Sequence, residues 1–193
     1  MTIVERALIR DAKEKIGEVI TLKGFVQTVR NQKAVQFIIL RDHTGLIQII
    51  AERFEANRPL NELIAGLTRE SAIQVTGVVV SNPNVKLGQL EIQLQTFCID
   101  SISDPTLPID IFGTTETEID KRLDWRFLDL RQPENQLIFR IQTTVEMAMR
   151  EFWISNGFVE IHTPKIMGSP SEGGSELFTL EYFGQTASLA QSP

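Results

Sequence analysis

Several residue types on which common functions depend are scarce in this sequence. Cys98 is the only cysteine, which excludes a framework of internal disulfides and fits a reducing, cytoplasmic location. No apolar run approaches the roughly 20 residues that span a bilayer, and residues 1–6 lack the basic, apolar and small-residue order of a secretory signal. His43 and His162 are the only histidines. Because neither has an evident partner nearby in sequence, we expect turn and strand residues and predict no metal ligand.

Basic residues are also in deficit, which at first argues against nucleic-acid binding. The chain carries 19 basic and 25 acidic residues, a net charge of −6, whereas phosphate contacts favour Lys and Arg. The imbalance is confined to one half, because residues 1–100 hold 12 basic and 11 acidic residues while residues 101–193 hold 7 and 14. If RNA is bound, the first half is the better candidate, and nonspecific binding along the whole surface is disfavoured.

Alternating apolar and polar residues predict a small barrel in the first half. The segment 19–29 places Ile20, Leu22 and Val26 on one side, as in a half-buried strand. Similar segments, separated by turn-forming residues, occur at 34–40, 46–51, 72–80 and 89–99, with an amphipathic helix at 60–67 and a leading helix at 1–15. Three strands, a helix and two strands is the order of the OB-fold, which often binds oligonucleotides on its second and third strands.

The character of the sequence changes after Asp100. Residues 101–132 contain prolines, glycine and a Thr/Glu cluster and end in a compact charged element, which predicts a connector or hinge. Pro133 then begins a helix whose apolar residues exceed a single stripe, so part of the helix surface should be exposed. We therefore expect a barrel domain over 1–100, a connector over 101–132 and a second domain over 133–193, with a helix at 133–156 and short strands at 158–161, 177–183 and 187–190.

Two residues of the predicted barrel are placed to contact an RNA base. If the turn after the second strand centres on Asp42 and His43, Phe37 lies directly opposite Gln48 on one sheet face. A base can stack on the ring, for roughly 1 to 3 kcal/mol, while the amide can donate to and accept from a base edge. Glu91 alternates with apolar residues in the last strand, which places its carboxylate on a polar face. The alternative is that Phe37 belongs to the core and that Gln48 and Glu91 are solvated strand residues.

Several segments together resemble the aspartyl-tRNA synthetases of the archaeal and eukaryotic type. One of them, 156–166, looks like motif 1 of the class II synthetases. The others are residues 37–48, 122–131, 171–178 and 189–193. The resemblance covers nearly the whole chain and implies an OB-fold β barrel that binds the anticodon, followed by the truncated start of an α+β class II catalytic domain.

The resemblance assigns roles to barrel residues. Phe37 would stack on the central anticodon base, while Gln48 and Glu91 would complete the reading of the anticodon. The family reads the first anticodon base near the first strand and the loop before the last strand, where this sequence has Gln27 and a loop containing Lys86. Gln27 replaces the bulkier or imidazole side chains associated with that position. The choice between charging aspartate tRNA alone and charging asparagine tRNA as well therefore stays open.

The resemblance also assigns roles in the second domain. Pro164 lies in motif 1, which implies a homodimer with this proline near the partner's active site. Ser171, Glu172, Gly173 and Gly174 resemble the mobile loop that closes over the amino acid. The Glu172 carboxylate would face the ammonium group of aspartate, and the glycines would serve as hinges because they accept unusual backbone angles.

The implied reaction is the ATP-dependent attachment of aspartate to tRNA, which requires cations and Mg²⁺ on the phosphates. The family places the residues that hold ATP and the aspartate side chain after the point where this sequence stops, and the chain contains no P-loop. We therefore expect an N-terminal fragment with no catalytic residues of its own and no activity alone. Two alternatives stay open: a tRNA-binding module that has lost catalysis, and an asparaginyl- or lysyl-tRNA synthetase. The gene sequence after Pro193 would separate the module from a fragment.

Overall fold

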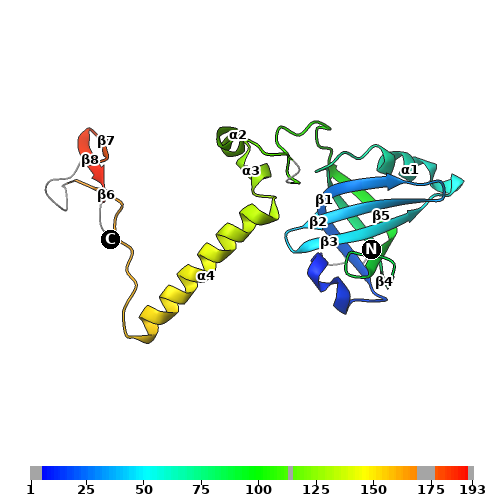
Figure 1. The fold of residues 1–193 in the computed structure, drawn as a ribbon, viewed down its shortest axis with the longest axis horizontal. Helices are drawn as coiled ribbons and strands as arrows, with labels where there is room; N and C mark the ends of the chain where they lie inside the picture. Colours follow the sequence, from blue (N-terminus) through cyan, green and yellow to red (C-terminus); the bar gives the residue numbers. More distant parts are fainter. Residues whose placement is uncertain (1–5, 113–114, 169–176, 191–193) are drawn as a thin grey trace. The chain divides into compact units, whose positions relative to one another are not determined.

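The computed structural model divides the chain into two compact units, Met1–Pro108 and Ile109–Pro193. It describes residues 6–112, 115–168 and 177–190. The first unit is built of strands, whereas the second contains a long helix and a small sheet (Figure 1).

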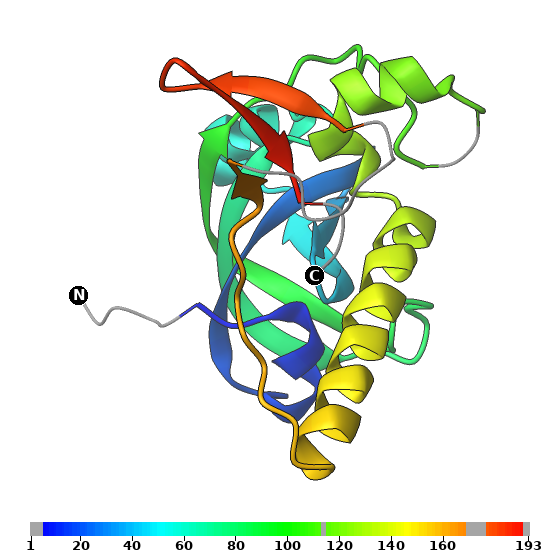
Figure 2. The ribbon, with the colours of Figure 1, turned by 90° about the vertical axis from the view of Figure 1, so that its left-hand side faces the viewer.

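Five strands of the first unit form a closed barrel in the order β1-β2-β3-β5-β4 (Figure 2). The strands are β1 (Val19–Asn31), β2 (Val35–Asp42), β3 (Gly45–Glu52), β4 (Ala72–Ser81) and β5 (Leu90–Ser101). Between β3 and β4 lie the short helices η2 (Glu55–Asn57) and α1 (Arg58–Ala65). Every strand pair in the barrel is antiparallel except β3 with β5. The predicted OB-fold is confirmed.

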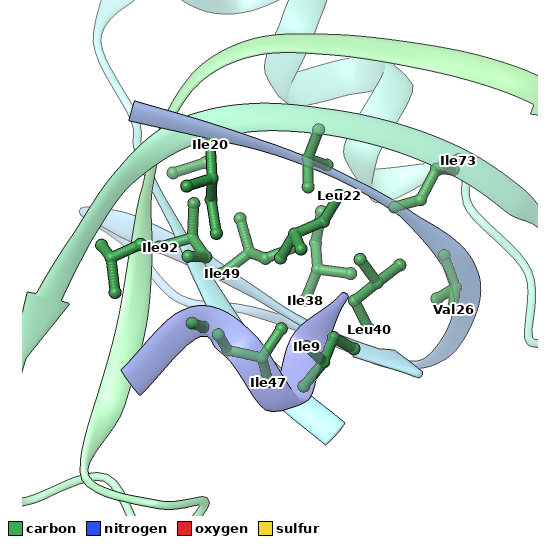
Figure 3. Close-up of a cluster of buried hydrophobic side chains, with 14 of the residues drawn as sticks. Ile9, Ile20, Leu22, Val26, Ile38, Leu40, Ile47, Ile49, Ile73 and Ile92 are labelled. Atoms are coloured by element: carbon green, nitrogen blue, oxygen red, sulfur yellow. The ribbon is translucent and has the colours of Figure 1, made fainter. Parts of the chain in front are cut away.

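The barrel interior is filled by aliphatic side chains from all five strands (Figure 3). In β4, buried and half-buried residues alternate strictly, because successive side chains of a strand point to opposite faces. Ile38, Leu40 and Ile49 from the central hairpin are fully buried. Their neighbours Phe37, Gln48 and Ile50 therefore face the outside of the barrel. Phe37 is not a core residue, so that alternative is wrong.

From Arg6 on, where the structure describes the chain, the predicted leading helix is wrong in type and in extent. This part contains a short 3-10 helix, η1 (Ile9–Glu14), whose Ala12 and Ile9 are buried. Figure 3 shows Ile9 among the core side chains. Before η1, the chain is held along β1, since the backbone N–H of Ala7 donates to the Thr21 carbonyl oxygen at 2.8 Å. This contact replaces the helical hydrogen bonds that the four-residue spacing of apolar residues had suggested.

The turn between β2 and β3 is fixed by the carboxylate of Asp42. One oxygen accepts from the backbone N–H of Ile9 at 2.9 Å, and the other accepts from the Thr44 hydroxyl and from the backbone N–H groups of Thr44 and Gly45. Burial alone would raise the pKa of Asp42, but these hydrogen bonds stabilise the charged form and together lower the pKa below its ordinary value of 3.8. The ionised carboxylate therefore contributes to folding.

We expect Asp42→Asn to lower the free energy of unfolding of the barrel by about 1 to 2 kcal/mol at neutral pH, because a charged acceptor is lost from the turn. The difference from wild type should be complete above pH 3.8 and should shrink as the pH falls through the lowered pKa of the folded state. In that window the unfolded chain binds more protons, so stability falls with pH.

Urea unfolding at several pH values checks this, with amide exchange in β2 and β3 as the readout. Tryptophan and tyrosine fluorescence would not report on the barrel, since Trp125, Trp153 and Tyr182 all lie in the second unit. Glu14→Gln, which neutralises an exposed carboxylate, is the matched control. A wild-type advantage over Asp42→Asn that stays constant down to pH 3 would contradict the assignment.

The second unit begins with two short helices around a buried carboxylate. These are α2 (Ile119–Asp124) and α3 (Arg126–Asp129). The side chain of Asp129 is fully buried and accepts hydrogen bonds from the guanidinium groups of Arg122 and Arg126 and from the Asn135 amide. Asn135 belongs to the next helix, so this charged cluster fixes the start of that helix against the two short ones. The compact charged element predicted from the sequence is confirmed.

The long helix α4 (Pro133–Ser155) is confirmed almost to the residue. Its apolar side chains are largely exposed within the described part of the chain, as expected; Ile138 is 61% exposed and Phe152 59%. No helix that the structure describes is long and apolar enough to cross a membrane.

The segment after α4 departs from expectation. The strand predicted at 158–161 is wrong, because the described residues offer these residues no neighbouring strand and the whole segment is exposed. It is held instead by α4, through an ion pair between Arg150 and Glu160 at 3.1 Å. A three-stranded sheet then follows in the order β6-β8-β7, made of β6 (Ile166–Met167), β7 (Thr179–Tyr182) and β8 (Gln185–Leu189).

Candidate nucleic-acid interface

A groove with a volume of about 660 Å³ lies on the outer face of the barrel. Its walls come from β1, β2 and β3 and from the loop between β4 and β5. All five barrel residues predicted to contact the anticodon line it, namely Gln27, Phe37, Gln48, Lys86 and Glu91. Gln27 and Glu91, 64 positions apart in the chain, are thus brought to one surface by the closure of the barrel.

The predicted pairing of Phe37 with Gln48 is wrong by two positions. Phe37 pairs with Ile50, and Gln48 pairs with Ile39, because the turn centres on His43 and Thr44. The shift arises from the Asp42 carboxylate, which holds the backbone N–H groups beyond it and so places the turn one residue later. A shift of two residues keeps each side chain on its face of the sheet. Phe37 and Gln48 are therefore diagonal neighbours on the groove wall.

Glu91 is less exposed than expected, because two amides cover its carboxylate. It pairs with Gln48 in the parallel β3–β5 ladder, and the Gln48 side-chain N–H donates to one carboxylate oxygen at 3.0 Å. The Asn82 amide donates to the other at 3.1 Å, and Glu91 is only 7% exposed. The reading of Glu91 as a solvated strand residue is therefore wrong, whereas Gln48 is half-buried. One N–H of the Gln48 amide is thus engaged by Glu91, whereas its carbonyl oxygen accepts no hydrogen bond within the described residues and is available to a base in the groove that Gln48 lines.

Sequence reasoning recognised Asn82 only as a turn former. A polar side chain that donates to a residue nine positions away, on the neighbouring strand, does not alter the hydrophobic periodicity. In the sequence, Asn82 stands out only because it precedes a proline in a loop. That pattern is common in turns whose asparagine makes no contact with a neighbouring strand.

Gln27 occupies a break in the register of β1. Val26 pairs with Leu40 and Thr28 pairs with Ile39, so Gln27 is an extra residue without a partner on β2. Such a bulge bends the strand and redirects the side chain. Gln27 lines the groove for this reason, and the sequence alone did not indicate the irregularity.

The groove is more basic than the chain as a whole. Its charged residues are Arg30, Lys86 and Glu91, which gives two cations against one anion in a chain of net charge −6. Arg30 was not among the predicted site residues. Phosphate oxygens favour such a surface, since each Lys or Arg that neutralises a phosphate releases a counterion.

The site residues predicted in the second unit are not brought together in the described structure. Pro164 lies in the exposed segment after α4. Ser171, Glu172, Gly173 and Gly174 lie outside the described residues. Both histidines are exposed, and the described residues contain no group of three His, Cys, Asp or Glu side chains that could hold a metal ion.

Comparisons with known families match both units. Residues 20–99 match the family described as OB-fold nucleic acid binding domain. Residues 118–193 match the family described as tRNA synthetases class II (D, K and N). The second match does not favour a free-standing RNA-binding barrel.

Relatives in sequence are aspartate–tRNA ligases. The chain is 43% identical over 180 residues to the aspartate–tRNA(Asp/Asn) ligase of Methanopyrus kandleri, which covers 93% of this chain and 42% of that protein. It is 41% identical over 181 residues to the aspartate–tRNA(Asp) ligase of Pyrococcus horikoshii, covering 94% and 41%. The chain thus spans about two fifths of the length of these relatives.

Solved structures of similar fold are aspartyl- and asparaginyl-tRNA synthetases. Asparaginyl-tRNA synthetase from Pyrococcus horikoshii complexed with asparaginyl-adenylate has a TM-score of 0.84 and 26% identity, covering 98% of this chain and 43% of that one. Aspartyl tRNA synthetase from Entamoeba histolytica has a TM-score of 0.75 and 28% identity, covering 88% and 42%. Both units match, and nearly the whole chain is more than 40% identical to aspartate–tRNA ligases, so the chain belongs to the aspartyl-tRNA synthetase family of class II tRNA synthetases.

Proposed function

We propose that the whole protein is an aspartate–tRNA ligase, in which this chain supplies anticodon recognition and part of the catalytic domain. The support is the similarity of nearly the whole chain to aspartate–tRNA ligases of two kinds, one named for aspartate tRNA and one for both aspartate and asparagine tRNA. ATP and Mg²⁺ would serve the reaction. Residues 1–100 would bind the anticodon loop. Residues 101–132 would connect this domain to the catalytic domain, which begins with residues 133–193.

The observation that carries the proposal is the convergence of an aromatic ring, an oriented amide and two cations in one groove of an OB-fold. Aspartate codons require uracil at the centre of the anticodon, and uracil presents an N–H donor between two carbonyl acceptors. The Gln48 carbonyl oxygen is an acceptor for that N–H, while the Phe37 ring offers a surface on which the base can stack. Arg30 and Lys86 would contact phosphates or neighbouring bases.

The first anticodon base would lie between the β1 bulge and the β4–β5 loop. Gln27 and Lys86 line the groove from these two elements. We propose that this pair contacts that base, without assigning this chain to aspartate tRNA alone or to both tRNAs.

In the second unit, we propose that the exposed apolar face of α4 packs in a homodimer of the whole protein, with Pro164 near the partner's active site. The face includes Ile138, Val145 and Phe152, each more than half exposed. Such a surface marks an interaction site in a soluble protein. Ser171, Glu172, Gly173 and Gly174 would close over aspartate, with Glu172 facing its ammonium group.

Phe37→Ala tests the anticodon role. We expect the variant to bind an aspartate anticodon stem-loop RNA more weakly by about 1 to 3 kcal/mol, which is the contribution of one base stacked on an aromatic ring. Phe54→Ala is the matched control, because Phe54 is an exposed phenylalanine of the same unit that does not line the groove. Fluorescence anisotropy at fixed salt measures both affinities. Equal affinities of the Phe37→Ala and Phe54→Ala variants would remove the stacking role.

A further inference from the structure

We propose that Asn82 is a positioning residue for anticodon reading, which acts through the carboxylate of Glu91 and ties it to the β4–β5 loop. The inference rests on the proposed function and deepens it. It assigns to a loop residue a part in the recognition of the central anticodon base, although the Asn82 side chain is engaged by the protein itself.

Both the backbone and the side chain of Asn82 are hydrogen-bonded within the protein. Its backbone N–H donates to the Gln89 carbonyl oxygen at 2.8 Å, and its carbonyl oxygen accepts from the Val85 N–H at 3.0 Å. Its side-chain oxygen accepts from the backbone N–H of Asn84 at 3.1 Å, while its side-chain nitrogen donates to Glu91. The base of the loop and the position of the carboxylate are therefore set by one residue.

These contacts allow only one orientation of the Asn82 amide. Turning the amide over would place its oxygen against the Glu91 carboxylate and its nitrogen against the N–H of Asn84, so both hydrogen bonds would become repulsive contacts. Asparagine is thus the residue that can accept from the loop and donate to the carboxylate at the same time. Aspartate could do the first but not the second.

The carboxylate in turn orients Gln48. With one Glu91 oxygen held by Asn82, the other accepts from the Gln48 side-chain N–H at 3.0 Å, and the Gln48 carbonyl oxygen stays available as an acceptor in the groove. The cations of the groove, Arg30 and Lys86, come from β1 and from the loop itself. Release of the Asn82 contact would free Glu91 to turn toward these cations, and Gln48 would lose its fixed orientation.

The test compares the binding of two anticodon stem-loops, with uracil or cytosine at the central position, to the 193-residue chain. Asn82→Ala should weaken binding of the uracil RNA roughly tenfold, the effect of losing one hydrogen bond to a charged group. Binding of the cytosine RNA should change less than about twofold, so the preference for uracil should shrink. Asn82→Asp keeps the loop contact with Asn84 but sets two carboxylates side by side, and it should lose at least as much.

Two further variants separate positioning from loop stability. In a chain that already carries Glu91→Ala, adding Asn82→Ala should not weaken binding of the uracil RNA any further, because the carboxylate through which Asn82 acts has been removed. The exchange variant Asn82→Asp with Glu91→Gln restores a donor and an acceptor between the two positions and leaves an oxygen for Gln48. It should regain a large part of the uracil preference that Asn82→Asp alone loses.

The outcomes distinguish the inference from the function on which it rests. A wild-type chain that does not bind the uracil stem-loop would overturn the proposed anticodon role itself. Wild-type preference for uracil that survives in Asn82→Ala, or an Asn82→Asp variant equal to wild type, would overturn only the positioning role. If Asn82→Ala weakens binding of the uracil RNA equally with Glu91 present and with Glu91→Ala, the loss comes from the loop and not from the carboxylate. That result would likewise overturn the positioning role.

Discussion

Gly77→Ala is expected to destabilise the barrel by about 3 kcal/mol or more, since overpacking against backbone cannot be relieved by a side-chain rotation. A methyl group at this position would lie 2.1 Å from the carbonyl oxygen of Gln93 and 2.7 Å from a side-chain carbon of Ile92. Gly77 also lies at the register break between β4 and β5, where the two strands approach closely. The variant should therefore separate the strands that close the barrel.

Gly45→Ala is the matched control for this prediction. A methyl group at Gly45 would meet only a side-chain carbon of Ile9 at 3.6 Å, an ordinary van der Waals contact. Urea unfolding followed by amide exchange in β4 and β5 should show a large loss for Gly77→Ala and a loss below about 1 kcal/mol for Gly45→Ala. Similar midpoints for the two variants would mean that the strands can move apart without cost.

In the second unit, we expect Asp129→Ala to loosen the packing of α2 and α3 against the start of α4. Removing one partner of a buried ion pair commonly costs 3 to 5 kcal/mol. The loss here should be about 3 kcal/mol, at the lower end, because the side chains of Arg122 and Arg126 are 31% and 37% exposed and can regain water. The Asn135 amide would lose one of its acceptors but keep the backbone carbonyl oxygen of residue 129.

Amide exchange over residues 119–136 measures this effect without reference to the barrel. Asp124→Ala is the control, since it removes the same charge from an exposed position in α2. Exchange in this segment should accelerate strongly in Asp129→Ala and little in Asp124→Ala. Protection that is equal in the two variants would show that the cluster does not hold these helices together.

The strands and the long helix could be predicted from sequence because each carries a regular apolar period over many residues. Ile73, Val75 and Val79 alternate through β4, and the apolar residues of α4 recur every three or four positions. These patterns depend only on which face of the element is buried, so they can be recognised without knowing which strands or helices lie next to it. The face shared by Phe37 and Gln48 was predictable for the same reason.

The details of the groove were not predictable, because they depend on single polar contacts. The register of β2 and β3 follows from the Asp42 hydrogen bonds, and the position of Gln27 follows from a bulge. Part of the cover over Glu91 comes from Asn82, through one side-chain hydrogen bond between the ends of neighbouring strands β4 and β5. The strand predicted at 158–161 failed for a different reason: a strand needs a partner, and sequence alone does not say whether one is present.

The order of strands in the barrel has a consequence for how it folds during synthesis on the ribosome. β5 is the last strand of the barrel to be synthesised, yet it lies between β3 and β4 and completes the ladder. At roughly 5 to 20 residues per second, the hairpin of β2 and β3 leaves the ribosome seconds before its last neighbour. During that interval β3 is an unpaired edge that could join another nascent chain. Until β5 is made, the edge of β3 is therefore the part of the barrel most open to pairing between chains.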